Sequence, residues 1–340
     1  MPKSVARLKD IAALTGFSVN TVSLALRVSP RIPEETRTVI LNAAAQMNYL
    51  PNQVAQSLVR RETRSIGLIL TDLTNPVLTA VAQAIEVQLS KRGYTTLFAT
   101  SNNTLSLEAQ MIETIRARRA DGLLIFPCSH RQLDHLRALR RRNYPVVLLV
   151  GDPDAGIDAV CMDERAGAFK GAAHLINNGH ARIALVDGAA TRGNTEKQDG
   201  FLNAHRHLGL AHDPRLMITP AGNSVAAGYW AMDDLVGRRL GVSAVFCSND
   251  SLALGVLSYC TRNGLRVPED IAIVGFDNIE FGEYAVTPLS TINYDVPRVT
   301  KLAIERVLDL IQCNGELPEA RVTQVEPDLL VRESSNRRFR

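Results

Sequence analysis

The sequence lacks any long hydrophobic run. No apolar stretch approaches the ~18–20 residues that a membrane-spanning helix needs, and residues 1–4 lead into a helical pattern without the apolar core of a signal peptide. Hydrophobic residues make up 46% of the 340 residues and charged residues 21%, which is typical of a globular chain with two or three domains. We therefore expect a cytoplasmic protein that does not contact a membrane.

Cysteine is sparse as well. The five cysteines are odd in number and include no CxxC pair, which predicts buried or idle thiols rather than a disulfide framework or a metal site. The histidines form one cluster, at His205, His207 and His212. A spacing of two residues on a helix sends two rings in different directions, so the cluster predicts a solvated helix end. No metal and no cofactor is expected.

The glycines form no nucleotide-binding motif. None of the 22 glycines lies two residues from another, so a GxG pair, and with it the GxGxxG fingerprint, is absent. A Walker lysine motif and a GxSxG nucleophile elbow are also missing. We therefore expect that the chain is not an enzyme, and a nucleotide-dependent enzyme on an α/β fold is the less favoured alternative.

What is present begins with a short helix at residues 8–15 that ends in a tight turn. Ile11, Ala12 and Leu14 recur at helical spacing. Ala12 is small enough for a second helix to pack close, and Gly16 tolerates the positive φ that a reversal of the chain requires. The first helix is therefore expected to stop near Thr15.

A second short helix follows the turn. Ser18 occupies an N-cap position, and Val22 and Leu26, four residues apart, predict the buried face. The remaining residues of the helix are left to face solvent or DNA: Val19, Asn20, Thr21, Ser23 and Leu24. Two short helices broken by a tight turn are the arrangement that lays a helix in the major groove of DNA, although an ordinary helical hairpin has the same pattern.

Positive charge is concentrated in the same part of the chain. Residues 1–64 contain nine Lys or Arg and four Asp or Glu, a net charge of +5, whereas the whole chain carries +3. The other 276 residues therefore sum to −2. A solvated face can carry such charge, but a small basic domain is expected of a module that binds phosphates.

Residues 32–48 predict a third, amphipathic helix with Pro33 in its first turn. Its inward face is expected to hold Val39, Ile40, Ala43, Ala44 and Met47. Residues 52–59 then read as a short helix with an Asn cap. Because eight residues are too few for a stable isolated helix, this segment is expected to order only against a partner or DNA.

From residue 65 the pattern changes to alternating strands and helices. The expected strands are 66–70, 97–99, 123–126 and 146–150, then 183–186, 217–218, 244–247 and 271–276. The expected helices are 76–91, 105–118 and 131–142, then 166–176, 196–208, 226–235 and 251–261. Two successive sets of βα units predict two parallel, helix-flanked sheets, and two such sheets facing each other form a ligand cleft at the carboxyl ends of their strands.

Ordered short motifs along the whole chain resemble the lactose-repressor/galactose-repressor family. They include KDIA (9–12), GFS (16–18), TVS (21–23), NYLPN (48–52), VAQSL (54–58), ND (249–250), GLRVPED (264–270) and GFD (275–277). The resemblance implies a dimeric transcription regulator, most simply a repressor, with a helix-turn-helix domain and a core like periplasmic binding proteins. It implies a palindromic double-stranded operator and a small sugar-like effector, and a solute-binding protein without a regulatory role is the alternative.

The resemblance also predicts domain boundaries. The helix-turn-helix domain is expected at 1–51, the hinge helix and linker at 52–64, one core subdomain at 65–162 with 293–323, and the other at 163–292 with 324–340. No heptad extension for a tetramer bundle follows residue 334, so a homodimer is expected.

The resemblance assigns DNA contacts to the helix pair and the hinge. Val19, Asn20 and Leu24 match positions that read bases; Asn20 can bond a base edge, whereas Leu24 offers only apolar contact. Leu58 matches a hinge leucine that wedges into the central base step and kinks the duplex. The full set expected at DNA is Leu8, Ser18, Val19, Asn20, Thr21, Ser23, Leu24, Arg27, Arg31, Asn52, Gln53, Ala55 and Leu58.

The residues that the resemblance places in the effector cleft follow strand ends. They are Asp72, Asn75, Phe126, Asp163, Lys197, Asn249, Asp277 and Tyr294. Asp163 and Asp277 each precede an expected helix, so helix capping is an alternative role for them. Lys197 stands where many relatives have an Arg, and a point charge that could face a carboxylate predicts a sugar or sugar acid as the effector.

Overall fold

The computed structural model describes residues 6–49, 62–151, 153–189, 193–313 and 315–336. The chain divides into two compact units, Met1–Thr63 and Arg64–Arg340, and each is described by itself. None of the helices within the described residues is both long and apolar enough to cross a membrane.

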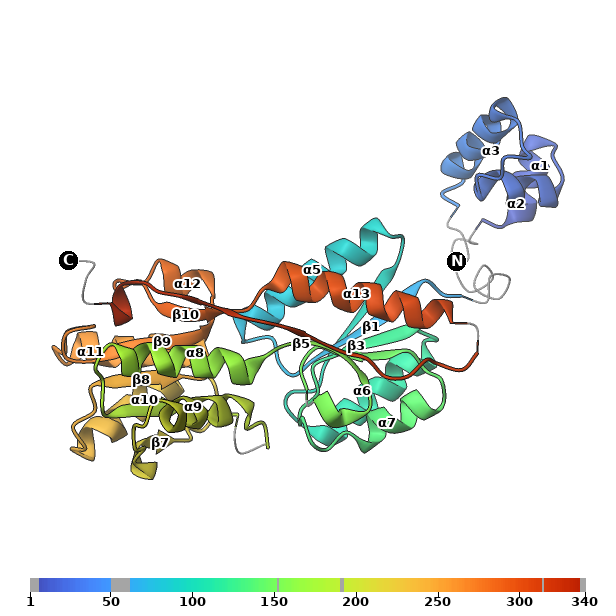
Figure 1. Cartoon of the computed structure of the whole chain (residues 1–340). Helices are drawn as coiled ribbons and strands as arrows, with labels where there is room; N and C mark the ends of the chain where they lie inside the picture. Colours follow the sequence, from blue (N-terminus) through green and yellow to red (C-terminus); the bar gives the residue numbers. More distant parts are fainter. Residues whose placement is uncertain (1–5, 50–61, 152, 190–192, 314, 337–340) are drawn as a thin grey trace. The chain divides into compact units, whose positions relative to one another are not determined.

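The first unit is a bundle of three helices (Figure 1). They are α1 (Leu8–Thr15), α2 (Val19–Leu26) and α3 (Glu34–Gln46). Gly16 ends α1 with φ of 73°, and the Ser18 side chain caps α2 by accepting a hydrogen bond from the Thr21 N–H at 3.0 Å. The predicted turn and cap are therefore confirmed.

The core of this unit is small and differs in part from the predicted faces. Its buried residues are Ile11, Ala12, Val22, Ala25, Ile32, Ile40, Ala43 and Ala44. Val39 is 50% exposed, so placing it on the inward face of the third helix was wrong, and Leu14, which has helical spacing with Ile11, is 58% exposed. Leu26 and Met47 pack only at the edge of this core. Three short helices enclose too little space to bury every apolar residue at helical spacing.

The second unit contains two six-stranded sheets, which confirms the predicted fold class. The first sheet has the order β11-β5-β4-β3-β1-β2 and only parallel pairs. Its strands are β1 (Ser65–Leu70), β2 (Thr95–Thr100), β3 (Gly122–Ile125), β4 (Val146–Leu148), β5 (Asp158–Met162) and β11 (Val322–Val325).

The second sheet has the order β12-β10-β9-β8-β6-β7, and β12 is the antiparallel edge strand. Its strands are β6 (Ile183–Val186), β7 (Met217–Ile218), β8 (Ala244–Cys247), β9 (Ala272–Asp277), β10 (Ser290–Asn293) and β12 (Asp328–Leu330). The chain passes between the sheets three times, after β5, after β10 and after β11 (Figure 1).

Helices flank both sheets. They are α5 (Pro76–Lys91), α6 (Leu105–Ala117), α7 (Asp134–Arg141), α8 (Glu164–Asn177), α9 (Glu196–His207), α10 (Val225–Gly237), α11 (Asp250–Arg262), α12 (Glu280–Glu283) and α13 (Val296–Gln312). The continuous apolar strands and the helices of the βα units match the predicted ranges to within a few residues. Strands β5, β10, β11 and β12 and helix α13 were not predicted, although α13 packs beside α5 on the first sheet (Figure 1).

One member of the histidine cluster, His205, is buried in the core and does not lie at a solvated helix end. The His205 side chain is 2% exposed, and its Nδ1 lies 3.0 Å from the Phe201 carbonyl oxygen. Its ring packs against Phe201 and His212. Helix α9 packs against α8, and the rings of Phe201 and His212 cover His205, so tertiary packing buries it. The interpretation was therefore wrong for His205 but holds for His207, which is exposed at the end of α9. Cys128, Cys161, Cys247 and Cys260 are buried thiols that form no disulfide within the described residues, as predicted.

Candidate functional site

Two adjoining cavities lie between the sheets, at the carboxyl ends of the strands. The inner chamber has a volume of about 130 Å³ and is lined by loops that follow β1, β3, β6, β8 and β9. Seven of the eight residues expected at the effector line it: Asp72, Asn75, Phe126, Lys197, Asn249, Asp277 and Tyr294. Residues more than 200 positions apart in the chain thus converge on one cavity.

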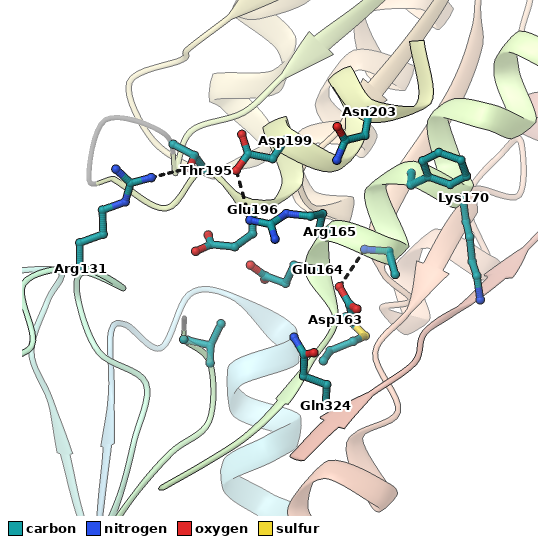
Figure 2. A pocket seen from close by; sticks show the side chains of 15 residues that line it. Arg131, Asp163, Glu164, Arg165, Lys170, Thr195, Glu196, Asp199, Asn203 and Gln324 are labelled. Atoms are coloured by element: carbon teal, nitrogen blue, oxygen red, sulfur yellow. Dashed lines mark hydrogen bonds and ion pairs between the residues drawn. The ribbon is translucent and has the colours of Figure 1, made fainter. Parts of the chain in front are cut away.

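The outer chamber has a volume of about 510 Å³ and is lined by the eighth residue, Asp163 (Figure 2). Val150 and Glu164 line both chambers, so the two are continuous parts of one cleft. Arg165 and Asp199 approach to 3.4 Å on the rim of this chamber. Glu164 and Glu196 extend into its open space (Figure 2).

Three of the expected cleft residues are helix N-caps. Asn75 caps α5, Asp163 caps α8 and Asn249 caps α11; each side-chain oxygen accepts a backbone N–H, at 3.1, 2.8 and 2.7 Å. A parallel βα unit places each helix N-terminus just beyond the end of its strand, so the same residue can cap and line the cleft. The capping alternative therefore holds for Asp163, which also faces the outer chamber.

Asp72 organises the loop after β1. Its Oδ1 accepts hydrogen bonds from the Thr74 N–H at 2.8 Å and the Asn75 N–H at 3.0 Å, and Asn103 donates to its Oδ2 at 3.3 Å. Because both oxygens are engaged, Asp72 orders the wall of the inner chamber as well as contributing charge to it.

Two aromatic rings close the inner chamber. Phe126 is buried after β3, and Tyr294 is buried after β10, with its hydroxyl 3.5 Å from the Leu149 carbonyl oxygen. Burial raises the pKa of the Tyr294 hydroxyl well above its usual value, so this group stays neutral. The rings supply apolar walls to the chamber.

Lys197 already has partners within the protein. Its Nζ donates to the Ser248 carbonyl oxygen at 2.9 Å, lies 3.2 Å from Glu164 Oε1, and stands 4.0 Å from the centre of the Phe276 ring. Burial by itself would lower the pKa of Lys197, but the charges of Glu164, Asp277 and Asp187 raise it above its usual value. Lys197 is therefore a neutralised cation at the base of the cleft.

Asp277 lies at the end of β9 and is 7% exposed. Its φ is 111° and that of Asn278 is 57°, so two consecutive non-glycine residues adopt positive φ. Such backbone costs of order 1–3 kcal/mol per residue and persists only where its surroundings enforce it. Asp277 does not cap α12, whose N-cap is Ile279, so the capping alternative was wrong for this residue.

A buried network enforces the turn after Asp277. The Asn278 N–H donates to Thr291 Oγ1 at 3.2 Å, and the Ile279 N–H donates to Asp250 Oδ2 at 2.9 Å. Thr291 Oγ1 in turn donates to Asp250 Oδ1 at 2.7 Å. Burial raises the pKa of Asp250 to about 7, and the hydrogen bonds from Thr291 and Ile279 limit that rise.

Direct contacts join the two sides of the cleft. The loop after β3 and the segment that begins α9 meet through His130 N–H to Asn194 Oδ1 at 2.9 Å, His130 Nδ1 to Glu196 Oε2 at 3.0 Å, and Arg131 Nη2 to Thr195 Oγ1 at 3.1 Å. These contacts hold the described conformation with the cleft closed at this point.

The carboxylate of Glu164 lies close to this junction. One ligand atom each from His130, Glu164 and Glu196 falls within 4.8 Å of the others, a spacing that could hold a cation. The Lys197 ammonium, 3.2 Å from Glu164 Oε1, already supplies a positive charge to this cluster.

Sequence reasoning missed several residues of the cleft. Glu164, His130, Asn194, Asn223 and Ser248 line the inner chamber and were not predicted. His130, Ser248 and Glu164 stand within a few residues of strand ends, so the rule that selected the other cleft residues could have found them. Nothing in the sequence shows that Glu164 meets Lys197.

The predicted DNA-reading helix is α2. Val19 and Asn20 are exposed, whereas Leu24 packs partly against the core of the first unit. Arg27 is exposed and donates to the Ser23 hydroxyl, and Arg31 is exposed in the following turn. The expected contacts at Asn52, Gln53, Ala55 and Leu58, and with them the hinge helix, lie outside the described residues.

Two family models match the chain. The model described as bacterial regulatory proteins of the lacI family matches residues 7–52, and a periplasmic binding protein-like domain matches residues 172–335. A protein named HTH-type transcriptional repressor PurR from Aliivibrio fischeri (strain ATCC 700601 / ES114) is 32% identical over 341 residues, covering 99% of this chain and 100% of the relative. The protein of the same name from Glaesserella parasuis serovar 5 is 32% identical over 343 residues, covering 97% and 98%.

Solved structures show the same fold. The lac repressor dimer bound to operator and the anti-inducer ONPF superposes with a TM-score of 0.88 at 23% identity, covering 98% of this chain and 99% of that chain. The complex of the transcriptional regulator CelR with cellobiose has a TM-score of 0.71 at 26% identity, covering 97% and 100%.

Proposed function

The chain belongs to the lacI family of bacterial regulatory proteins and is a DNA-binding transcriptional repressor, and from this premise we propose that a sugar or sugar acid in the cleft controls its hold on a palindromic operator. One observation carries the proposal. Seven residues selected for effector binding converge on one cavity between two sheets of a chain that also carries a helix-turn-helix unit. The relatives are named repressors, in line with the expectation that the chain is not an enzyme.

The proposed DNA contacts divide by chemistry. Asn20 bonds a base edge and Val19 meets a thymine methyl, since both are exposed on α2. Ser18 and Thr21 at the N-terminus of α2 contact phosphates, and so does Arg27 at its end. Leu8, Ser23, Leu24, Arg31, Asn52, Gln53 and Ala55 complete the proposed set, and Leu58 remains the proposed wedge between base pairs.

The proposed switch is a change between open and closed clefts. The three segments in which the chain crosses between the sheets connect the two subdomains that would move. We assign residues 65–162 with 293–323 and residues 163–292 with 324–340 to the two subdomains, although β11 of the first sheet extends to Val325. An effector that contacts both sides changes the free-energy difference between open and closed clefts. In the proposed mechanism that change alters whether the hinges of two subunits pair on DNA, which places the protein's action in the cytoplasm.

The proposed assembly is a homodimer. Phe281, Tyr284 and Val286, in and just after α12, are exposed, as is Trp230 on α10; Val286 is 90% exposed. Large apolar side chains gathered at one short element are typical of an interface. Sedimentation should give a dimer for the natural chain and a monomer for Tyr284→Glu, whereas Leu208→Glu, at the end of α9, should stay dimeric.

The central experiment is a gel-shift assay of the full chain with DNA selected from a palindromic random library. We expect one operator class, bound with an affinity that falls by about 10³-fold or more between 50 and 200 mM salt. Asn20→Ala should lose about 1–3 kcal/mol of binding and relax the preference at one base pair. The matched control is Asn42→Ala on the exposed side of α3, which should bind as the natural chain does. Selection that yields no preferred sequence would refute the proposed function.

A further inference from the structure

The charges that line the inner chamber are mostly negative. Among the described residues that line it, Asp72, Glu164 and Asp277 are acidic and Lys197 is the one lysine or arginine. Lys197 is not available to a ligand anion, because its ammonium already contacts the Ser248 carbonyl oxygen and the Glu164 carboxylate and lies over the Phe276 ring. A ligand carboxylate entering this chamber would meet three acidic side chains and a cation that is already paired.

Helix N-termini attract anions, and several open toward this cleft. At three of these helix ends a side-chain oxygen already accepts one backbone N–H: Asn75 at α5, Asp163 at α8 and Asn249 at α11. Helix α9 has Glu196 as its first residue. These capping oxygens and the Glu196 carboxylate therefore compete with an anionic ligand for the N–H groups of the helix ends.

Asp277 is the acidic group with no hydrogen-bonding partner of its own. It lines the chamber and is 7% exposed, and no hydrogen bond to its carboxylate is formed within the described part of the chain. The positive φ of Asp277 and the network of Asp250, Thr291 and Ile279 hold it in place. A buried carboxylate without a donor costs free energy, so its position is expected to serve a ligand that supplies one.

Two further buried acceptors lack donors, and one of them lies on the chamber wall. Asn223 Oδ1, on the chamber wall, and Asp187 Oδ2, at the end of β6, are buried and have no hydrogen-bond partner in the described residues. Gly188 lies between these groups, and a Cβ built there would stand 2.4 Å from Asn223 Oδ1. The close approach permits no side chain at position 188, so the backbone there lies directly against Asn223.

We infer that the effector carries a positively charged amino group that binds Asp277, so that the cleft selects an amino sugar, or a similarly aminated polyol, over a sugar acid. This inference rests on the proposed function and narrows the chemistry of its effector. An ammonium supplies three donors where the cleft has acceptors without donors, and its charge opposes the excess of carboxylates. The hydroxyls of the same molecule suit the amide and backbone groups around it.

The protonation of Asp277 supplies an independent readout. Burial raises its pKa well above the usual value, the charges of Asp250 and Glu164 act in the same direction, and Lys197 opposes them. An ammonium bound to Asp277 favours the ionised form and lowers this pKa, so binding should release protons at a pH where the carboxyl of the free protein is still partly protonated. Calorimetric titrations in phosphate and in MOPS, two buffers that differ in heat of ionisation and carry no primary amine, measure that release directly.

The test uses matched probes on the full chain. D-glucose, D-galactose and D-mannose are compared with their 2-amino-2-deoxy forms and their uronates, by thermal shift and then by calorimetry. We expect at least one hexosamine to bind about tenfold or more tighter than its neutral hexose, the range for one charge-assisted hydrogen bond, and its uronate to bind more weakly than both.

Asp277→Asn should remove the amine preference and the proton release. Asparagine tolerates positive φ, so the fold should survive, which circular dichroism and operator binding will show. The matched control is Asp199→Asn, which removes a charge from the rim of the outer chamber and should keep the preference. Three results would each overturn the inference. They are tighter binding of uronates than of hexosamines, no binding of any hexosamine, and an amine preference that persists in Asp277→Asn. If the natural chain still binds its selected operator when one of these results is found, the proposed function holds and only the inference about an amino group fails.

Discussion

The hydrogen bonds across the cleft lead to a quantitative prediction about its opening. The His130 N–H donates to Asn194 Oδ1, and His130 Nδ1 faces Glu196 Oε2 at 3.0 Å, with side chains that are 5% and 17% exposed. Burial would raise the pKa of Glu196, but the hydrogen bond and charge of His130 lower it below its usual value of 4.5. Glu196 is thus an ionised partner in a mostly buried contact.

The perturbation is Glu196→Gln, which keeps the size of the side chain and an oxygen that accepts a hydrogen bond but removes the charge. A hydrogen bond to a charged group is worth about 1.5–3 kcal/mol and a neutral one about 0.5–1.5. The change should therefore cost about 1–1.5 kcal/mol of closure, which raises the population of the open cleft about fivefold to tenfold.

Residue-resolved hydrogen exchange measures this equilibrium, because the His130 N–H is bonded only across the cleft and must lose that bond to exchange. Its protection factor should fall about fivefold to tenfold in Glu196→Gln. Glu113→Gln, which removes an exposed ion pair with Arg116 on α6, is the control and should leave it unchanged. After correction for intrinsic rates, the Glu196 contribution should be complete above pH 4.5 and lost as the pH falls through the lowered pKa. Unchanged protection in Glu196→Gln would refute the reasoning.

Three further predictions concern stability. Because burial raises the pKa of Asp250 to about 7, the folded state binds a proton more tightly than the unfolded state. The free energy of unfolding, measured by urea titration, should therefore fall by about 4 kcal/mol at most between pH 4 and 7. Asp250→Asn should reduce this dependence on pH. A Cβ at Gly255 would lie 2.0 Å from the Val225 carbonyl oxygen, whereas one at Gly237 meets nothing within 4 Å. Gly255→Ala should therefore lower the free energy of unfolding by about 1–3 kcal/mol or more. Gly237→Ala should not lower it. Ser18→Ala removes the cap of α2 and should destabilise the first unit by about 1 kcal/mol, seen in calorimetry of the full chain, while Ser18→Asp should restore it.

The elements that the sequence predicted well share one physical property. Strands such as β6, β8 and β9 are buried on both faces, so they read as short continuous apolar runs, and the helices between them have clear start and stop residues. Of the missed strands, β5 and β10 are buried but carry polar residues, and β11 and β12 are only partly buried and also carry polar residues. Their pairing depends on the chain crossing back between the sheets, which no local pattern records.

Burial within elements was predicted less well than the elements themselves. Leu14 and Val39 have helical spacing but are exposed, whereas His205, expected in solvent, lies under Phe201 and His212. Helical periodicity predicts which residues share a face. It does not predict how much of that face a neighbouring element covers.

For the effector cleft, the sequence by itself determined which side chains gather there. Parallel strands end at one edge of a sheet, so Asn249 and Asp277, at or after the ends of the neighbouring strands β8 and β9, had to meet. Only the tertiary structure decided their electrostatic state. Lys197 reads from the sequence as a cation for a ligand carboxylate, yet it is paired with Glu164 across the starts of two helices, and Asp277 is left without a donor. Charges interact through space, so the sign that the cleft presents to a ligand depends on which groups the fold has already paired.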